Sequence, residues 1–228
     1  MLGPAVLAAI REPWVRWDWV SRHTVLIRHD LWEHVVLTGI AVGVGLLIAA
    51  PLALLVRRWR WLQGPVLSFT GVLYTIPSLA LLALLVPWTG LTRTTAEVAL
   101  VSYTLLILVR NIVAGLDGVP ADVREAAEGM GYGSTRQLVR VELPLALPVI
   151  VAGIRIAVVT TIGLVTITAL IGQGGYGQLI LDGLQRDFHT PLVVGTILSV
   201  VLATVIDLLL IGFDKLVTPW SRSRVRVV

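Results

Sequence analysis

The sequence lacks cysteine altogether and has a single lysine, Lys215. Without cysteine the chain forms no disulfide bond, no thiolate metal site and no cysteine nucleophile. It has no Gly-x-x-x-x-Gly-Lys-Ser/Thr motif, which excludes a P-loop for nucleotide phosphates. It also lacks the His-Glu-x-x-His pair of zinc peptidases and the Gly-x-Ser-x-Gly turn of serine hydrolases. We therefore expect no catalytic residue, no metal site and no cofactor bound by this chain.

Charge is scarce as well. Charged residues make up 14% of the chain, whereas soluble domains have about 25%. So little charge cannot cover a water-facing surface, and the 56% of hydrophobic residues exclude intrinsic disorder. The net charge of +4 is interpreted as the basic excess that marks the cytoplasmic loops of membrane proteins. The expected surroundings are a lipid bilayer, and nucleic acid is not an expected partner.

Long apolar stretches are what the sequence does contain. A membrane-spanning helix needs about 20 apolar residues. Five segments qualify, namely 35–56, 64–92, 94–116, 143–172 and 190–213. The third is the weakest, because Glu97 and Arg110 lie within it. We expect an all-α polytopic membrane protein with about five transmembrane helices, and Pro77 is expected to kink the second.

Basic residues predict the orientation. Ten lie after the first span, between the third and fourth, and after the fifth, whereas six lie on the opposite side. The positive-inside rule then places the N-terminus outside and the C-terminus in the cytoplasm. Residues 1–34 carry four tryptophans among charges, so we expect an interfacial helix there, with a disordered polar tail as the alternative. Residues 35–228 are expected to form the transmembrane domain.

Two charges fall deep within apolar segments, Arg155 in the fourth and Asp207 in the fifth. An arginine at mid-span costs about 2.5–3.5 kcal/mol on insertion scales. The 13 Leu, Ile and Val residues of 145–167 contribute about −0.3 to −0.6 kcal/mol each, so this segment still inserts. Intramembrane charges are candidates for function by default. We expect an ion pair or a helix-to-helix hydrogen bond, and a place on a transport pathway is the alternative.

The most informative stretch is the loop 117–142 between the third and fourth spans. Its first half favours a short helix, and alternating glycines around Gly131 end it. Ser134 predicts the N-cap of a second short helix, with Gln137 as its capping-box partner, and Pro144 is expected to start the fourth span. Five acidic against three basic residues would be repelled by anionic lipid, so the loop better suits a protein partner.

A set of residues in and just after this loop stands at a distinctive spacing. They are Glu125, Ala126, Ala127, Gly131, Val141, Leu143 and Pro144. This spacing resembles the EAA loop of bacterial ABC-importer permeases, which reads Glu-Ala-Ala, three residues, Gly, nine residues, Ile, any residue, Leu, Pro. Every defined position matches except that valine replaces isoleucine.

The resemblance covers most of the chain and is closest to the permeases for quaternary-amine osmoprotectants. It includes Tyr-Thr-Ile-Pro-Ser-Leu-Ala at 74–80 and the glycine-rich stretch 169–177, in which Gln173 and Tyr176 depart from the pattern. Residues 1–34 lie outside it. The glycines expected next to a gate are Gly172, Gly174, Gly175 and Gly177.

The resemblance implies a fold and a set of partners. The fold is the type I ABC-importer permease bundle, in a bacterial cytoplasmic membrane. Two permeases, identical or homologous, form the pore, two cytoplasmic ATPase subunits dock beneath it with ATP and magnesium, and an external binding protein delivers the solute. The EAA loop supplies the coupling helix, with Glu125 as a polar docking contact and Gly131 as the elbow. Ala126 and Ala127 allow close packing against the ATPase.

The implied solute is a quaternary amine such as glycine betaine, choline, carnitine or proline betaine. Because quaternary ammonium groups bind to aromatic faces, Tyr74 and Tyr103 are candidates for the pathway, with core packing as the alternative. A permease for methionine, phosphonate or nitrate is the alternative within the class. An ion-coupled secondary transporter is a further alternative, although it predicts cavity-facing acids or an inverted repeat, and only Asp207 is deeply placed.

Overall fold

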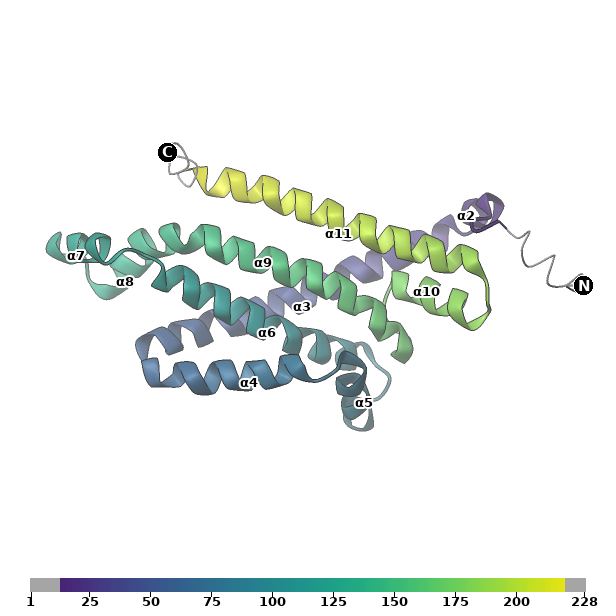
Figure 1. Cartoon of the computed structure of the whole chain (residues 1–228), viewed down its shortest axis with the longest axis horizontal. Helices are drawn as coiled ribbons and strands as arrows, with labels where there is room; N and C mark the ends of the chain where they lie inside the picture. Colours follow the sequence, from purple (N-terminus) through teal and green to yellow (C-terminus); the bar gives the residue numbers. More distant parts are fainter. Residues whose placement is uncertain (1–12, 220–228) are drawn as a thin grey trace, which may run out of the picture.

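The computed structural model describes residues 13–219, and all regular structure in that range is helical (Figure 1). The helices in chain order are α2 (Trp17–Arg22), α3 (Thr24–Arg58), η1 (Arg60–Leu62), α4 (Gln63–Thr75), α5 (Ser78–Thr89), α6 (Arg93–Asp117), α7 (Ala121–Gly129), α8 (Ser134–Gln137), η2 (Leu138–Glu142), α9 (Leu143–Val165), η3 (Thr166–Ile171), α10 (Tyr176–Gln185) and α11 (His189–Val217). Of the three η segments, η1 and η3 are 3₁₀ helices and η2 is a π-helix.

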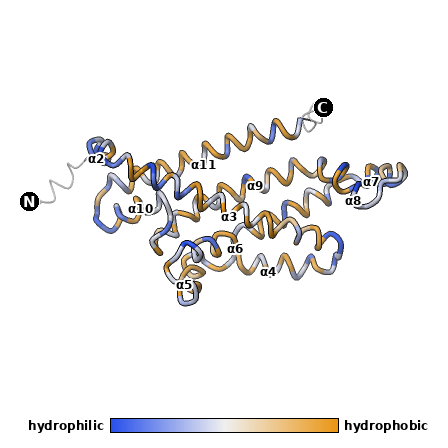
Figure 2. The backbone as a smooth tube through the Cα atoms, turned by 180° about the vertical axis from the view of Figure 1, so that it is seen from behind, coloured by the Kyte–Doolittle hydropathy of each residue, from blue (hydrophilic) through white to orange (hydrophobic). Residues whose placement is uncertain are grey.

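The predicted number of membrane spans is confirmed. Four helices are long and apolar enough to cross a membrane, namely α3, α6, α11 and the continuous helix Ser134–Ile171. The bent pair of α4 and α5 brings the number to five if it counts as one span. Figure 2 shows hydrophobic residues along these helices and hydrophilic stretches concentrated at the ends of the bundle.

The second span differs from a single kinked helix. It breaks between α4 and α5 with a bend of 94°, so α4 lies along the bundle while α5 turns away from it (Figure 1). Pro77 stands at this break with φ −55° and ψ 133°, an extended conformation that a helix cannot contain. The hydroxyl of Tyr103 donates a hydrogen bond to the carbonyl of Ile76, which satisfies one acceptor freed by the break.

The helix that contains the first span begins before the predicted span does. The span was expected from residue 35, but α3 begins at Thr24, so the expected boundary between residues 34 and 35 falls inside a helix. Asp30 and His34, on the part of α3 before that boundary, are buried. Residues 1–12 of the expected N-terminal segment lie outside the described range, and an interfacial position for the remainder stays a prediction.

Helix α6 forms the centre of the bundle. In the most apolar 18-residue stretch of α6, 61% of the residues are buried. The corresponding share for α11, which packs on the rim, is 6%. Helices α3 and α9 both pack on α6 and also contact each other. At Gly45 the backbone of α3 comes so close to α6 that a Cβ atom would lie 2.0 Å from the Thr104 hydroxyl. The apolar surface that α11 leaves uncovered needs lipid or another membrane subunit to cover it.

Candidate functional site

The loop between α6 and α9 forms one end of the molecule and carries the EAA residues (Figure 1). Its first helix, α7, is tied back to the end of α6 by Arg124, whose Nη2 donates to the carbonyl of Asp117 at 3.2 Å and to that of Val119 at 2.6 Å. Glu125 and Ala126 are exposed on α7, whereas Ala127 is buried. Helix α7 therefore offers an exposed surface that carries its three acidic residues, and Arg124 anchors the helix to the end of α6.

Gly131 forms the elbow after α7. Its φ of +76° is the left-handed conformation that glycine adopts without cost. The amide of Gly131 donates to the carbonyl of Glu128 at 2.9 Å, and that of Tyr132 donates to the carbonyl of Ala127 at 3.1 Å. This pair of hydrogen bonds is a Schellman motif, which closes the C-terminus of the helix. The predicted glycine elbow is confirmed.

The second helix differs from the prediction. Ser134 was expected to cap α8, but the N-cap is Gly133 and, among the described residues, no side chain caps this helix. The capping box with Gln137 is therefore wrong. Pro144 lies in the first turn of α9, as expected for the start of the fourth span, and α9 is part of a helix that runs without interruption from Ser134 to Ile171. Val141 lies within the π-helical turn η2 of that helix, and Leu143 follows the turn as the first residue of α9.

Gln137 instead takes part in a buried polar network that sequence reasoning missed. Its Nε2 donates to Glu142 Oε1 at 3.0 Å, and the guanidinium of Arg57, at the end of α3, forms an ion pair with the other Glu142 oxygen. The Glu142 side chain is 3% exposed and that of Arg57 is 22% exposed. A cavity of about 350 Å³ between α3 and the loop borders this network. The network joins α3 to the start of the long helix that follows the elbow.

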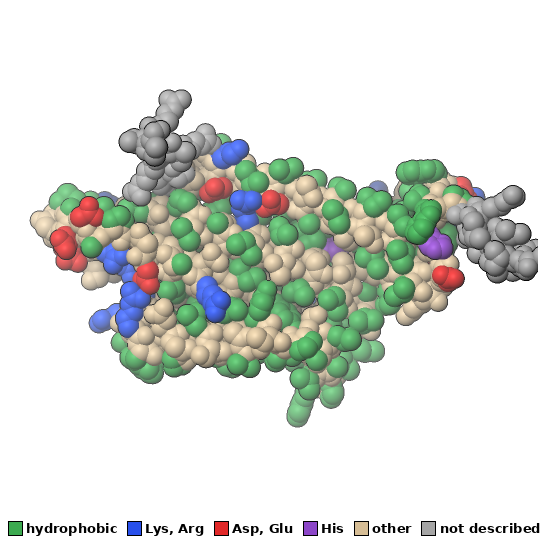
Figure 3. Space-filling model, in the orientation of Figure 1, with side chains coloured by type: hydrophobic (Ala, Val, Ile, Leu, Met, Phe, Trp, Pro, Cys, Tyr) green, Lys and Arg blue, Asp and Glu red, His purple; other side chains and the backbone are tan. Residues whose placement is uncertain are grey.

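The two intramembrane charges meet. Arg155 Nε and Nη2 donate to the two carboxylate oxygens of Asp207 at 3.0 and 3.1 Å, which is the bidentate geometry of a strong ion pair. The expected ion pair between Arg155 and Asp207 is confirmed. The pair joins α9 to α11 and borders a cavity of about 540 Å³. Figure 3 shows basic and acidic side chains beside each other between these two helices, on a surface that is otherwise largely uncharged.

Tyr74 and Tyr103 lie next to each other near the break in the second span. Their ring centroids are 6.0 Å apart with an interplanar angle of 71°, an edge-to-face contact. Tyr103 is 6% exposed, and its hydroxyl is committed to the Ile76 carbonyl, so it packs in the core. Tyr74 is 39% exposed. Of the two rings, only that of Tyr74 offers a face to the surroundings.

The glycine-rich stretch lies against the N-terminal part of α3. Gly172 ends η3 with φ +78°, and Gly174 (φ +131°) donates its amide to Glu33 Oε1 at 3.2 Å. Gly175 has φ +52°, and a Cβ there would lie 2.5 Å from the Asp30 carbonyl. A Cβ at Gly177 would lie 2.3 Å from the carbonyl oxygen of Thr166, the first residue of η3. These glycines permit a backbone-to-backbone contact that no larger residue allows.

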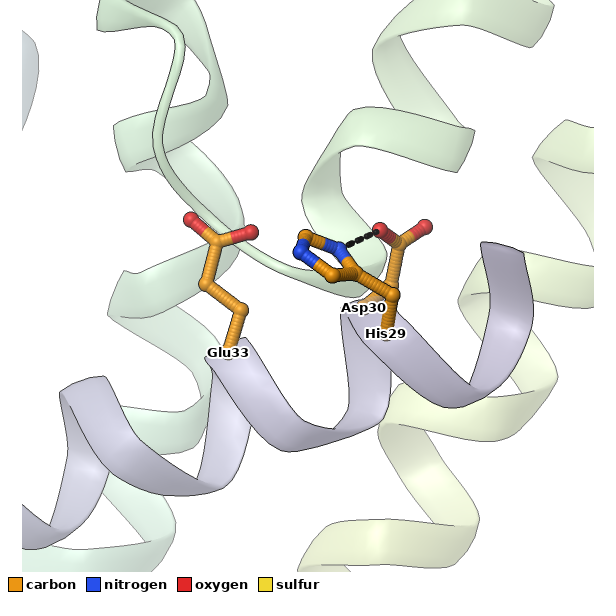
Figure 4. A group of neighbouring side chains, drawn as sticks. All are labelled: His29, Asp30 and Glu33. Carbon is orange, nitrogen blue, oxygen red and sulfur yellow. Dashed lines mark ion pairs between the residues drawn. The ribbon is translucent and has the colours of Figure 1, made fainter. Parts of the chain in front are cut away.

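His29, Asp30 and Glu33 gather on α3 beside that stretch, with ligand-type atoms all within 4.8 Å of one another (Figure 4). His29 Nδ1 lies 3.5 Å from Asp30 Oδ1, and Glu33 accepts the hydrogen bond from Gly174. Figure 4 shows the ion pair between His29 and Asp30 and the Glu33 side chain one turn further along α3, and the hydrogen bond from Gly174 to Glu33 links α3 to the glycine stretch.

Comparison with known proteins places this arrangement in a family. Residues 41–219 match the family described as binding-protein-dependent transport system inner membrane component. The chain is 41% identical to the osmoprotectant import permease protein OsmW of Salmonella typhimurium, over 82% of this chain and 89% of that protein. It is 36% identical to the choline transport system permease protein OpuBB of Bacillus subtilis, over 87% of this chain and 91% of the relative.

Solved structures agree on the fold. A chain from the structure of inward-facing conformations of the MetNI methionine ABC transporter superimposes with a TM-score of 0.75 and 23% identity, covering 86% of this chain and 98% of that one. An amino acid ABC transporter solved with histidines gives a TM-score of 0.75 at 21% identity, over 88% and 98% of the two chains. The chain thus belongs to the binding-protein-dependent inner membrane components, as a permease subunit of the ABC-importer class.

Proposed function

We propose that this chain forms half of the translocation pathway for a quaternary-amine compatible solute such as glycine betaine, choline, carnitine or proline betaine. The observation that carries the choice of solute is the identity of 32–41% to permeases that are named for osmoprotectants, choline and carnitine. Each of these relatives aligns with more than four-fifths of the chain, the bundle and the loop included. The likeness to a methionine transporter, at 23% identity, supports the fold alone.

The loop geometry supports coupling to an ATPase. Helix α7 presents Glu125 and Ala126 on its exposed face, the elbow at Gly131 is closed by backbone hydrogen bonds, and the next helix continues without a break into the membrane span. Force applied to α7 by a docked subunit is therefore delivered to a rigid helix. In this proposal the loop faces the cytoplasm, the C-terminus lies on the same side, and the N-terminus lies outside.

The proposed assembly has two permeases, two ATPase subunits and an external binding protein. A second permease, identical or homologous, covers apolar surface that α11 leaves open in this chain. ATP and magnesium bind to the ATPase subunits, since the sequence has no P-loop. Tyr74 is the aromatic candidate for the pathway, and the stretch Gly172–Gly177 is the candidate for the region next to the gate.

Solute identity is tested with the complete complex, formed from this chain, the ATPase and the binding protein encoded beside it, in ATP-loaded proteoliposomes. Uptake of radiolabelled glycine betaine, choline and carnitine is compared with that of methionine, a phosphonate and nitrate. The proposal predicts uptake of at least one quaternary amine and competition among them. Transport of methionine, phosphonate or nitrate alone would refute the proposed solute class while leaving the permease role intact.

The coupling role of α7 is tested in the same proteoliposomes. Glu125→Lys reverses the charge on the exposed face of α7 and should lower both solute uptake and the ATP hydrolysis that the loaded binding protein stimulates. Glu128→Lys, a second exposed acid on the same helix, tests whether the effect depends on position. Normal coupling in Glu125→Lys would contradict the docking role.

A further inference from the structure

The Arg155–Asp207 pair lies far from both ends of its helices, α9 (Leu143–Val165) and α11 (His189–Val217). Even so, 28% of the Arg155 side chain and 32% of that of Asp207 are exposed. Charged groups at this depth do not face lipid. They face the interior of a bundle or a water-filled cavity. The exposed side of this pair therefore needs either water or another protein subunit beside it.

The cavity at the pair has the size and lining of a ligand site. Its volume of about 540 Å³ falls within the range of about 300–1,000 Å³ that is common for small-molecule sites. Besides the pair, its wall includes the small or hydroxyl-bearing side chains Ala152, Thr160, Ala203 and Thr204. Small side chains leave room for a solute, and both charges border the same space.

We propose that Arg155 and Asp207 form a contact site within the pathway for a zwitterionic solute, one that carries a quaternary ammonium and a carboxylate. The inference rests on the proposed function and goes beyond it by assigning two residues and a preference among solutes. The guanidinium of Arg155 binds the solute carboxylate through parallel N–H donors. The carboxylate of Asp207 attracts the ammonium by charge alone, because a quaternary nitrogen has no proton to donate.

The preference among solutes follows from which ion-pair partners each solute can replace. When a solute enters, each member of the pair gives up its partner. A zwitterion replaces both partners and leaves no charge uncompensated. A monocation such as choline replaces only the partner of Asp207 and leaves Arg155 without a counter-charge, which is costly in a low-dielectric site. The site thus favours glycine betaine and carnitine over choline.

A purely structural tie between α9 and α11 predicts a different result on substitution. Replacing both members of a partly buried ion pair by apolar residues of similar size is often neutral or stabilising. Under a structural role, Arg155→Leu with Asp207→Leu therefore keeps transport. Under the proposed role, the same double variant loses transport, because both solute contacts are gone.

The experiment uses the reconstituted complex with its ATPase and binding protein. Initial uptake of glycine betaine and choline is measured for the wild type, the double leucine variant and the single variants Arg155→Gln and Arg155→Lys. Asp18→Asn with Arg22→Gln is the control, because this exposed pair at 3.0 Å lies on α2 and neither residue belongs to the coupling loop or lines the cavity. Copurification of the ATPase checks that each complex assembles.

The expected result is a loss of at least about tenfold in uptake for the double leucine variant, with the Asp18/Arg22 control near wild type. Arg155→Gln should raise the apparent KM for glycine betaine by about tenfold and that for choline less. Arg155→Lys keeps the positive charge but loses the parallel N–H donors of the guanidinium. Its apparent KM for glycine betaine should therefore lie between those of the wild type and Arg155→Gln. Wild-type uptake by the double leucine variant, or equal losses for both solutes in Arg155→Gln, would overturn the inference. Absence of ATP-driven uptake by the wild type would instead refute the proposed function.

Discussion

Glu142→Gln is the substitution that probes most directly how the loop is held to the bundle. The change keeps the shape of the side chain and its ability to bond with Gln137, and it removes one charge. Arg57 then keeps a positive charge in a largely buried position without the carboxylate that compensates it.

The expected loss in the free energy of unfolding depends on how deeply the Arg57–Glu142 ion pair is buried. Removing one partner of a fully buried ion pair costs about 3–5 kcal/mol. Because the Arg57 side chain is 22% exposed, water recovers part of that loss, and we expect about 2–3 kcal/mol, close to the value of a hydrogen bond to a charged group. In a domain of this size such a loss lowers the Tm by roughly 5–10 °C. Arg60→Gln, at an exposed pair, should cost well under about 1 kcal/mol.

The assay is thermal unfolding of the purified complex in detergent, followed by ATP hydrolysis and solute uptake at a temperature at which all variants are folded. Glu142→Gln should unfold earlier and transport less solute per ATP hydrolysed. Arg57→Met combined with Glu142→Leu should recover most of the stability, since neither charge then remains buried alone. A Glu142→Gln complex with wild-type Tm and wild-type coupling would refute the assignment of this network as the link between α3 and the loop.

Three further substitutions test other parts of the structure. Gly131→Ala forces a side chain into the left-handed region at about 1–2 kcal/mol, so ATPase copurification should weaken, whereas Gly133→Ala, at φ −71° and in open space, should not affect it. Tyr103→Phe leaves a carbonyl at the proline break without its donor and should lower the Tm by the equivalent of about 1–3 kcal/mol. Gly175→Ala places a Cβ 2.5 Å from the α3 backbone and should disrupt folding or transport, while Gly39→Ala, with open space around it, should be tolerated; equal behaviour of the two would contradict the close contact.

Local patterns predicted the parts of the fold that depend on local sequence. The largely apolar run 94–116 corresponds to α6 within one residue at either end, despite Glu97 and Arg110 within it, because an apolar stretch of that length has few alternatives to a membrane span. The loop helix and its glycine elbow were also predictable, since Gly131 is the residue type that a left-handed helix terminus selects. The bend at Pro77 was predictable as a kink, but its angle of 94° depends on how α5 packs.

Long-range partners could not be predicted in the same way. The start of α3 at Thr24 was missed because the charges and tryptophans before residue 35 favoured a separate interfacial helix, whereas tertiary packing buries Asp30 and His34 on the same helix as the span. The capping box at Ser134 failed because a following turn recruits Gln137 to Glu142 instead. The partner of Glu142, Arg57, is distant in sequence, and apolar periodicity carries no information on which helix ends meet.

The central claim is that this chain moves its solute by ATP hydrolysis in partner subunits and not by an ion gradient. The most direct measurement is glycine betaine uptake by the reconstituted complex with ATP and no ion gradient, compared with an imposed proton or sodium gradient and no ATP. Accumulation is expected only with ATP, and it should be lost when the ATPase carries an inactivated P-loop lysine. Accumulation driven by the gradient alone would contradict it.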